Sequence, residues 1–193
     1  PIAVAGHSLG EYSALVAAGA LSLADALPLV RFRAQAMQEA VPVGTGAMAA
    51  ILGLDAAAVR GGCSEAAQAA GEVVEAVNFN DPKQTVIAGG KAGVERACEL
   101  LKSRGAKRAL MLAVSAPFHS SLMKPAAERL RQRLEGVALS APRIAVVNNV
   151  DATVLDEPER IRDALYRQAF GAVRWVEVVQ ALRARGATAL IEC

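Results

Sequence analysis

The chain has 193 residues, of which 53% are apolar and 21% charged, and its formal net charge is +2. This length and apolar fraction are sufficient for one large domain, or for one domain that carries a small insertion. The near balance of charges and the 4% of aromatic residues argue against a nucleic-acid-binding protein, and no apolar run reaches the roughly 20 residues that a membrane-spanning helix requires.

The expected elements alternate between strands and helices, which indicates the α/β class. The chain begins with a short buried strand at residues 2–5, which leads through a glycine-rich turn into a helix at 10–19. A second helix begins after the N-cap candidate Ser22 and extends to about residue 40. Pro28 lies inside this helix and should kink or loosen the turn before it.

The pattern changes between residues 45 and 115. The expected elements there are a strand at 47–54, a helix at 55–70, strands at 72–80 and 84–89, a helix at 91–105 and a strand at 106–114. The order β-α-β-β-α-β is that of a ferredoxin-like unit. We therefore predict a small ferredoxin-like domain at 45–115, inserted into a large domain made of residues 1–44 and 116–193.

The rest of the large domain begins with a loop at 115–123 and a helix that ends near residue 134. A strand follows at 143–150, then helices at 157–170 and 173–185, and a last strand at 187–193. Because both ends of the chain then fall in strands, we expect it to be a fragment of a longer protein, cut at both ends.

The pentapeptide GHSLG at residues 6–10 lies between the first strand and the first helix. A G-x-S-x-G segment in that setting is typical of a nucleophile elbow, in which Ser8 is held out at the N-terminus of a helix. The free N–H groups there favour a developing oxyanion, and the N–H of Leu9 is the expected donor. The alternative is a glycine-rich turn with a capping serine.

A serine nucleophile needs a base, and the chain has only two histidines. The sharp turn should point the side chain of His7 away from its neighbour Ser8, which makes His119 the candidate; the alternative for His119 is a structural, hydrogen-bonded histidine. Neither Asp55 nor Asp81, both in the expected small domain, is an attractive partner for His119. A backbone carbonyl is the other group that can hold it.

Arg33 lies on an expected buried face of the second helix. Its neighbours at three and four positions are apolar, namely Leu29, Val30, Ala36 and Met37. A buried arginine needs an anionic partner, and a guanidinium binds a carboxylate in a bidentate fashion. We therefore expect Arg33 to bind an anionic group of the substrate; the alternative is an arginine whose charged end extends to the surface.

Several segments together resemble the malonyl-CoA:acyl carrier protein transacylases of bacterial fatty acid synthesis, among them GHSLGEYSALVAAGALSLADAL, VNFNDPKQTVIAG, SAPFHSSLMKPAA and VVNNVDA. The resemblance covers essentially the whole chain. It implies an α/β-hydrolase-like large domain with a parallel sheet and an inserted ferredoxin-like domain. The site residues that it implies are Ser8 as nucleophile, His119 as base, Gln168 as the main-chain acceptor that orients His119, Leu9 as oxyanion donor, and Arg33 and His7 as substrate-binding residues.

The activity implied by the resemblance is transfer of a malonyl group from malonyl-CoA to the phosphopantetheine thiol of acyl carrier protein, through a malonyl-serine intermediate, in the cytoplasm and without metal or other cofactor. The family also uses a glutamine of an N-terminal GQGSQ-type loop that this sequence lacks, so we expect the fragment itself to be poorly active. Lys124, Arg129 and Arg133 are candidates for steering an acidic carrier.

Three other functions remain open at this point. One is the malonyl-selective acyltransferase domain of a polyketide synthase. Another is a serine esterase of the GxSxG type, which should have an acidic residue before its histidine and no need for Arg33. The third is a non-catalytic module that docks a carrier protein and never becomes acylated.

Overall fold

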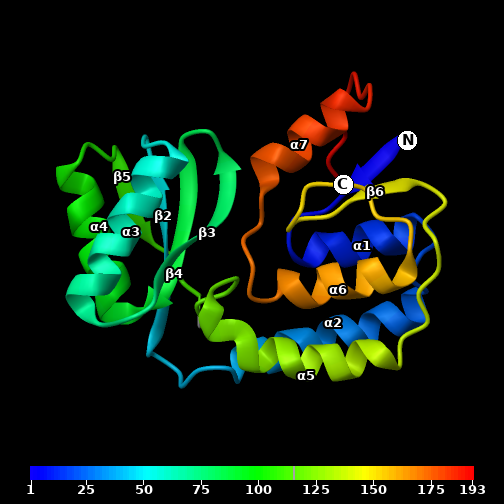
Figure 1. Ribbon diagram of the computed structural model, residues 1–193, viewed down its shortest axis with the longest axis horizontal. Helices are drawn as coiled ribbons and strands as arrows, with labels where there is room; N and C mark the ends of the chain where they lie inside the picture. Colours follow the sequence, from blue (N-terminus) through cyan, green and yellow to red (C-terminus); the bar gives the residue numbers. More distant parts are fainter. Residues whose placement is uncertain (115) are drawn as a thin grey trace.

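The computed structural model describes residues 1–114 and 116–193 and has the α/β architecture that the sequence pattern predicts. The strands in this part of the chain form two sheets, one parallel with two strands and one antiparallel with four. In Figure 1 the four-stranded sheet and two helices lie on the left, and the other helices gather around the small parallel sheet on the right. Ser115, where we expected the inserted domain to end, lies outside the described residues.

The parallel sheet joins β1 (Ala3–Ala5) to β6 (Ala145–Val147). Both strands were expected at these places, and both are shorter than expected. The helices that accompany them are α1 (Leu9–Ala17), α2 (Leu23–Gln38), α5 (Lys124–Glu135), α6 (Pro158–Gln168) and α7 (Trp175–Ala184), with a short 3-10 helix, η1 (Ser121–Met123), before α5.

Helix α2 begins as expected at Ser22, whose hydroxyl accepts a hydrogen bond from the backbone N–H of Asp25 at 3.0 Å. The helix continues past Pro28 as a single element to Gln38. Leu29 is completely buried in a core that α2 shares with α1, α5 and α6. Arg33, four positions later, is buried as well, which confirms the expected orientation of this helix.

The four-stranded sheet confirms the expected β-α-β-β-α-β order of elements. These are β2 (Gly46–Leu52), α3 (Ala56–Ala70), β3 (Val74–Asp81), β4 (Gln84–Gly90), α4 (Lys91–Ser103) and β5 (Arg108–Met111). The strands are arranged β3-β4-β2-β5, and all neighbours are antiparallel. Apolar side chains of the two helices and the sheet, including Ile51, Val59, Ile87 and Leu101, form a second core.

The two halves of the molecule are joined at β3. The backbone N–H of Phe79 donates to the carbonyl of Val173 at 2.9 Å, and the N–H of Val173 donates to the carbonyl of Val77 at 2.8 Å. The segment before α7 therefore extends the edge of the four-stranded sheet, as an isolated parallel bridge. This contact places β3 next to the turn between β1 and α1.

The strand expected at residues 187–193 is absent from the structure, in which this segment forms neither helix nor strand. Its two large apolar side chains are exposed, Leu190 at 59% and Ile191 at 88% of their full accessible area. A strand needs a neighbouring backbone with which to form its hydrogen-bond ladder, and no strand of the described residues pairs with this segment. None of the described helices has the length and apolar character required to cross a bilayer.

Candidate active site

Ser8 lies in a tight turn between β1 and α1. Its φ of +53° is in the left-handed region, which a non-glycine residue adopts only at some cost in free energy. The turn also brings two glycines together: a Cβ on Gly6 would lie 1.9 Å from the carbonyl oxygen of Gly10. The first glycine of the motif is therefore required by a close backbone approach, and the turn presents Ser8 at the start of α1.

The hydroxyl of Ser8 forms a hydrogen bond with His119, with 2.7 Å between Oγ and Nε2. Nδ1 of His119 donates to the main-chain oxygen of Gln168 at 2.8 Å. Because a carbonyl can only accept, Nδ1 carries the proton, and Nε2 is free to accept the proton of Ser8. The loop before η1 holds His119 in a left-handed conformation, with φ of +64°, and almost completely buried.

Burial and, to a smaller extent, the positive charge of Arg33 lower the pKa of His119 to about 3, although the hydrogen bond to Gln168 acts in the opposite direction. At neutral pH the imidazole is therefore uncharged, which is the form that can act as a base.

Arg33 reaches the same serine from α2. Its Nη2 donates to Ser8 Oγ and to Gln168 Oε1, at 3.0 Å in each case. The guanidinium carbon lies 5.5 Å from the centre of the Tyr12 ring, and Nε has no hydrogen-bond partner among the described residues. None of the ion pairs in this part of the structure includes Arg33. A buried cation with an unused donor thus lies beside the hydroxyl of Ser8.

Gln168, at the end of α6, connects these groups. Its side chain is fully buried, and Nε2 donates to the main-chain oxygen of Ser8 at 3.0 Å and to Glu11 Oε2 at 2.8 Å. Its main chain holds His119 and its side-chain oxygen accepts from Arg33. One residue thus contacts Ser8, His119 and Arg33.

The sequence pattern did not predict two further residues of this site. Asn149, just after β6, accepts from the backbone N–H of Ser8 at 2.7 Å and donates to the carbonyl of Gly6 at 2.8 Å. Its own N–H donates to Glu11 Oε2 at 3.0 Å. The available signal was a polar pair, Asn148-Asn149, directly after a buried strand, because the carboxyl ends of neighbouring parallel strands meet at one edge of a sheet.

Glu11 is the second residue that was missed. It lies in the first turn of α1 and is only 2% exposed. Burial raises its pKa to about 7, although the hydrogen bonds from Gln168 and Asn149 and the charge of Arg33 act in the opposite direction. The available signal was its position four residues before Leu15, on a helix face that is otherwise apolar.

The two remaining candidates of the motif have different environments. Nε2 of His7 lies 2.9 Å from Oδ1 of Asn80 in β3, and its ring meets that of Trp175 edge-on, with 5.4 Å between the ring centres. The side chain of His7 therefore connects the turn to β3 and α7. Leu9 is the first residue of α1, so its N–H has no acceptor within the helix, and its side chain is half exposed.

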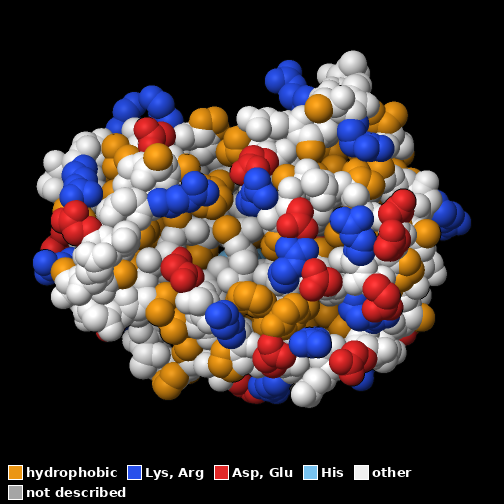
Figure 2. Space-filling model, viewed as in Figure 1, with side chains coloured by type: hydrophobic (Ala, Val, Ile, Leu, Met, Phe, Trp, Pro, Cys, Tyr) orange, Lys and Arg blue, Asp and Glu red, His pale blue; other side chains and the backbone are white. Residues whose placement is uncertain are grey.

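The charged surface is mixed in sign. Figure 2 shows Lys and Arg side chains alternating with Asp and Glu over the face in view. On α5, Arg129 is paired with Glu39 at 2.8 Å, and Lys124 lies 6.0 Å from the centre of the Phe170 ring. No group of three or more possible metal ligands occurs among the residues that the structure describes.

Comparison with known proteins identifies the family. The model of the acyl transferase domain matches residues 1–193. The malonyl CoA-acyl carrier protein transacylases of Haemophilus influenzae and Escherichia coli K12 are 55% and 54% identical to the chain over 192 residues. These alignments cover 100% of this chain but 61% and 62% of the relatives, so the chain spans about three fifths of their length.

A crystal structure of an acyl-carrier-protein S-malonyltransferase from Burkholderia pseudomallei matches with a TM-score of 0.97 at 66% identity, covering 100% of this chain and 62% of that one. A malonyl-transacylase solved in complex with a type II polyketide acyl carrier protein matches with a TM-score of 0.94 at 52% identity, covering 97% and 60%. With a hydrogen-bonded serine–histidine pair and a family match over its whole length, the chain belongs to the acyl transferase domain family.

Proposed function

We propose that the complete polypeptide carrying this sequence transfers a malonyl group from malonyl-CoA to the phosphopantetheine thiol of acyl carrier protein, through a malonyl ester on Ser8. One observation carries the proposal: Ser8 Oγ lies 2.7 Å from the base His119 and 3.0 Å from the cation Arg33. An acyl group that ends in a free carboxylate fits this pair, because its carboxylate can bind the cation while its thioester carbon meets the nucleophile.

In the first half of the reaction, His119 Nε2 takes the proton of Ser8 while Oγ bonds to the thioester carbon. The tetrahedral oxyanion is stabilised by the N–H of Leu9 and the N-terminus of α1. The bond from carbon to sulfur then breaks, and the sulfur of CoA leaves with the proton from His119. The products are free CoA and malonyl-Ser8.

In the second half, His119 takes the proton of the carrier's thiol, and the sulfur attacks the ester carbon. The ester bond breaks, and Ser8 Oγ recovers the proton from His119. The carrier leaves as its malonyl thioester, and the enzyme is unchanged. A neutral imidazole is needed at the start of each half, which agrees with the lowered pKa of His119.

Arg33 has the role of selecting the acyl group. Its Nη2 is held by Gln168 beside Ser8 Oγ, and its charge is not neutralised by an ion pair among the described residues. A bidentate bond to the malonyl carboxylate adds a charge-assisted contact that an acetyl group cannot make. In this proposal His7 is a minor contact, because its side chain is engaged with Asn80.

The domain division of the proposal is a large α/β-hydrolase-like catalytic domain of residues 1–44 and 116–193, with a ferredoxin-like domain of 45–115 inserted into it. The parallel pairing of β1 and β6 and the β3-β4-β2-β5 order support this division. Ser8, Arg33, His119 and Gln168 all belong to the large domain, and Asn80 approaches from the small one.

The proposal is tested by the intact mass of the protein after mixing with malonyl-CoA. We expect the addition of one malonyl group, located on the peptide that contains Ser8, and its transfer to acyl carrier protein on addition of the carrier. Ser8→Ala should abolish the adduct, whereas the matched control Ser103→Ala, which changes a serine at the end of α4, should keep it. An adduct that persists in Ser8→Ala would contradict the assignment.

A second candidate is a malonyltransferase that serves polyketide synthesis. The structure of a malonyl-transacylase with a type II polyketide acyl carrier protein, 52% identical to this chain, favours its consideration. Rates of transfer to purified carriers of both pathways distinguish the two. A serine esterase is disfavoured, since a main-chain carbonyl and not an acidic side chain holds Nδ1 of His119.

A further inference from the structure

Glu11 is a buried acid that the mechanism above does not use. It is the only carboxylic side chain among the buried residues that the structure describes. Its Oε2 accepts two hydrogen bonds, from Gln168 Nε2 at 2.8 Å and from the backbone N–H of Asn149 at 3.0 Å, and it forms no ion pair in the described part of the chain. A carboxyl group without a contacting cation is costly to bury, so these two bonds need a functional explanation.

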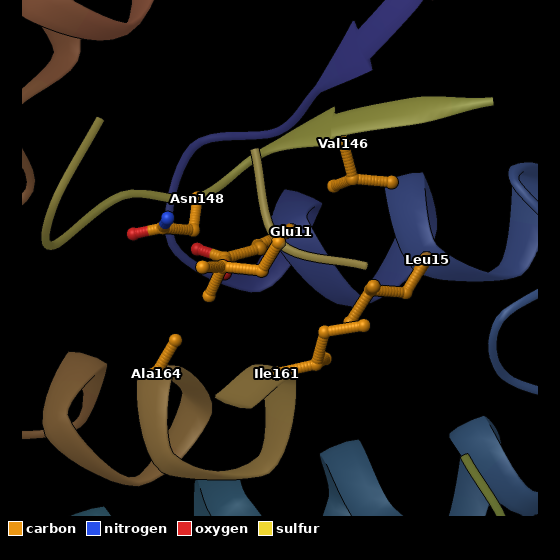
Figure 3. A pocket seen from close by; sticks show the side chains of 7 residues that line it. Glu11, Leu15, Val146, Asn148, Ile161 and Ala164 are labelled. Atoms are coloured by element: carbon orange, nitrogen blue, oxygen red, sulfur yellow. The ribbon is translucent and has the colours of Figure 1, made fainter. Parts of the chain in front are cut away.

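The mainly apolar surroundings of Glu11 offer few other groups that could solvate its carboxyl, apart from Gln168 and Asn149. Figure 3 shows the Glu11 side chain at the edge of a cavity lined mainly by apolar groups, among them Leu15, Val146 and Ile161. The cavity has a volume of about 10 Å³, close to the smallest that holds one water molecule. Glu11 is therefore solvated mainly by the protein, in a low-dielectric environment where each hydrogen bond is strong.

The hydrogen bond between Gln168 and Glu11 fixes the orientation of the side-chain amide of Gln168. Nε2 of Gln168 faces two acceptors, Glu11 Oε2 and the main-chain oxygen of Ser8, while Oε1 faces the donor Nη2 of Arg33. In the flipped orientation the amide oxygen would face two oxygens, and the amide nitrogen would face the guanidinium. Because Glu11 opposes that flip, it keeps an acceptor directed at Arg33.

We propose, on the basis of the function proposed above, that Glu11 is a positioning residue for recognition of the acyl carboxylate. It holds the Gln168 amide with its oxygen toward Arg33, and Gln168 in turn holds the guanidinium beside Ser8 Oγ. Glu11 itself does not touch the acyl group. It sets the preference for an anionic over a neutral acyl group through Gln168 and Arg33.

The ionisation of Glu11 gives this role a dependence on pH. The charged groups that act on Glu11 are Arg33 from α2 and Asp151 from the segment after β6, and burial is the largest influence, so that the pKa is raised to about 7. A carboxylate accepts hydrogen bonds more strongly than a carboxylic acid. The preference for an anionic acyl group should therefore decline as the pH falls through about 7.

The test uses two fluorophosphonates that react with Ser8, alike except that one ends in a carboxylate and the other in a neutral carboxamide. Both probes react directly with Ser8, so their labelling rates can be measured whether or not malonyl-CoA is the substrate. In Glu11→Gln we expect the preference for the carboxylate probe, measured as the ratio of the two labelling rates, to fall by about threefold to tenfold, because a neutral amide oxygen accepts from Gln168 Nε2 about half as strongly as a carboxylate.

The matched control is Glu72→Gln. Glu72 also accepts from a backbone N–H, that of Gly93 at 2.8 Å, but it is remote from the serine. We expect the probe preference of this variant to equal that of the unmodified protein. Equal losses with both probes in Glu11→Gln, or an unchanged ratio, would overturn the proposal.

If Glu11→Gln does not fold, the ratio measured in the unmodified protein across pH 7 decides instead, and a ratio independent of pH in that range would overturn the proposal. The two proposals fail separately. A protein that is not acylated by malonyl-CoA contradicts the proposed function but still reports a probe ratio, whereas an insensitive ratio contradicts only the role of Glu11.

Discussion

The main-chain oxygen of Gln168 lies 2.8 Å from Nδ1 of His119. In a serine–histidine–acid triad a carboxylate occupies that position and stabilises the imidazolium that forms during catalysis. A neutral carbonyl selects the same tautomer but carries no full charge, so it stabilises the imidazolium less. In the proposed reaction, the His119 imidazolium should therefore release its proton readily to the departing thiolate.

The first prediction concerns His119. His119→Ala should slow acylation of Ser8 by about 10²–10⁴-fold, the usual contribution of a positioned general base. Stopped-flow or quench-flow measurement of malonyl-Ser8 formation provides the rate. A near-normal rate in His119→Ala would mean that this histidine is structural.

The second prediction concerns Arg33. Arg33→Ala should reduce malonyl transfer far more than acetyl transfer, because only the malonyl group offers a carboxylate. Loss of a buried charge-assisted pair costs about 2–5 kcal/mol, or roughly 30-fold to several thousandfold in relative rate. Steady-state kcat/KM for both acyl-CoA substrates measures the ratio. Arg31→Ala, an exposed arginine on the same helix, is the control. Equal losses on both substrates would assign Arg33 a structural role.

The third prediction compares two neighbouring glycines in α3. Gly61 has open space around it, so Gly61→Ala should raise the free energy of unfolding by up to about 1 kcal/mol, the difference in helix propensity. At Gly62 an added Cβ would lie 2.5 Å from a methyl group of Leu101 in the core. Gly62→Ala should therefore destabilise the protein, by about 1–3 kcal/mol from overpacking less the helix gain. Urea unfolding of both variants measures the difference, and a shared sign would contradict the packing described for α3 and α4.

The fourth prediction concerns stability and pH. The pKa of Glu11 is raised from 4.5 to about 7, so the folded protein binds this proton more tightly than the unfolded chain. Its contribution to stability is complete below pH 4.5 and is lost as the pH rises toward about 7. The pKa of His119 is lowered from 6.5 to about 3, so its contribution is present above pH 6.5 and is lost as the pH falls toward about 3.

Between pH 4.5 and 6.5 the two contributions have opposite slopes. The variant His119→Gln should isolate Glu11, so that its free energy of unfolding decreases as the pH rises through this range. The variant Glu11→Gln should isolate His119 and show an increase. Denaturant unfolding at several pH values measures both slopes, and the same slope in both variants would be inconsistent with the burial of these groups.

Local patterns were sufficient to predict most of the elements. Apolar periodicity and caps such as Asp55, which accepts from the N–H of Ala58 at 2.8 Å, are properties of short segments. The prediction for 187–193 was wrong because a strand depends on a partner that its own residues do not specify. A strand-like run of apolar residues is only a tendency until another backbone lies beside it.

The site was harder to predict than the elements. The G-x-S-x-G motif indicated Ser8, and elimination among two histidines indicated His119. The contact with Gln168 uses a main-chain oxygen, which any residue type supplies, and so it was reached only through the family resemblance. Glu11 and Asn149 escaped notice because their roles depend on how α6 and β6 pack around α1, a long-range arrangement that spacing along the chain does not encode.

The two residues of the proposed proton transfer, Ser8 and His119, are also two of the three non-glycine residues with positive φ among those described. Such conformations cost on the order of 1–3 kcal/mol each, and glycine would relieve them. Glycine, which has no reactive side chain, would therefore give the lowest backbone strain at both positions. Stability and turnover make opposite demands at these two places, so a search for thermostable variants conducted without an activity screen would tend to replace the reacting groups first.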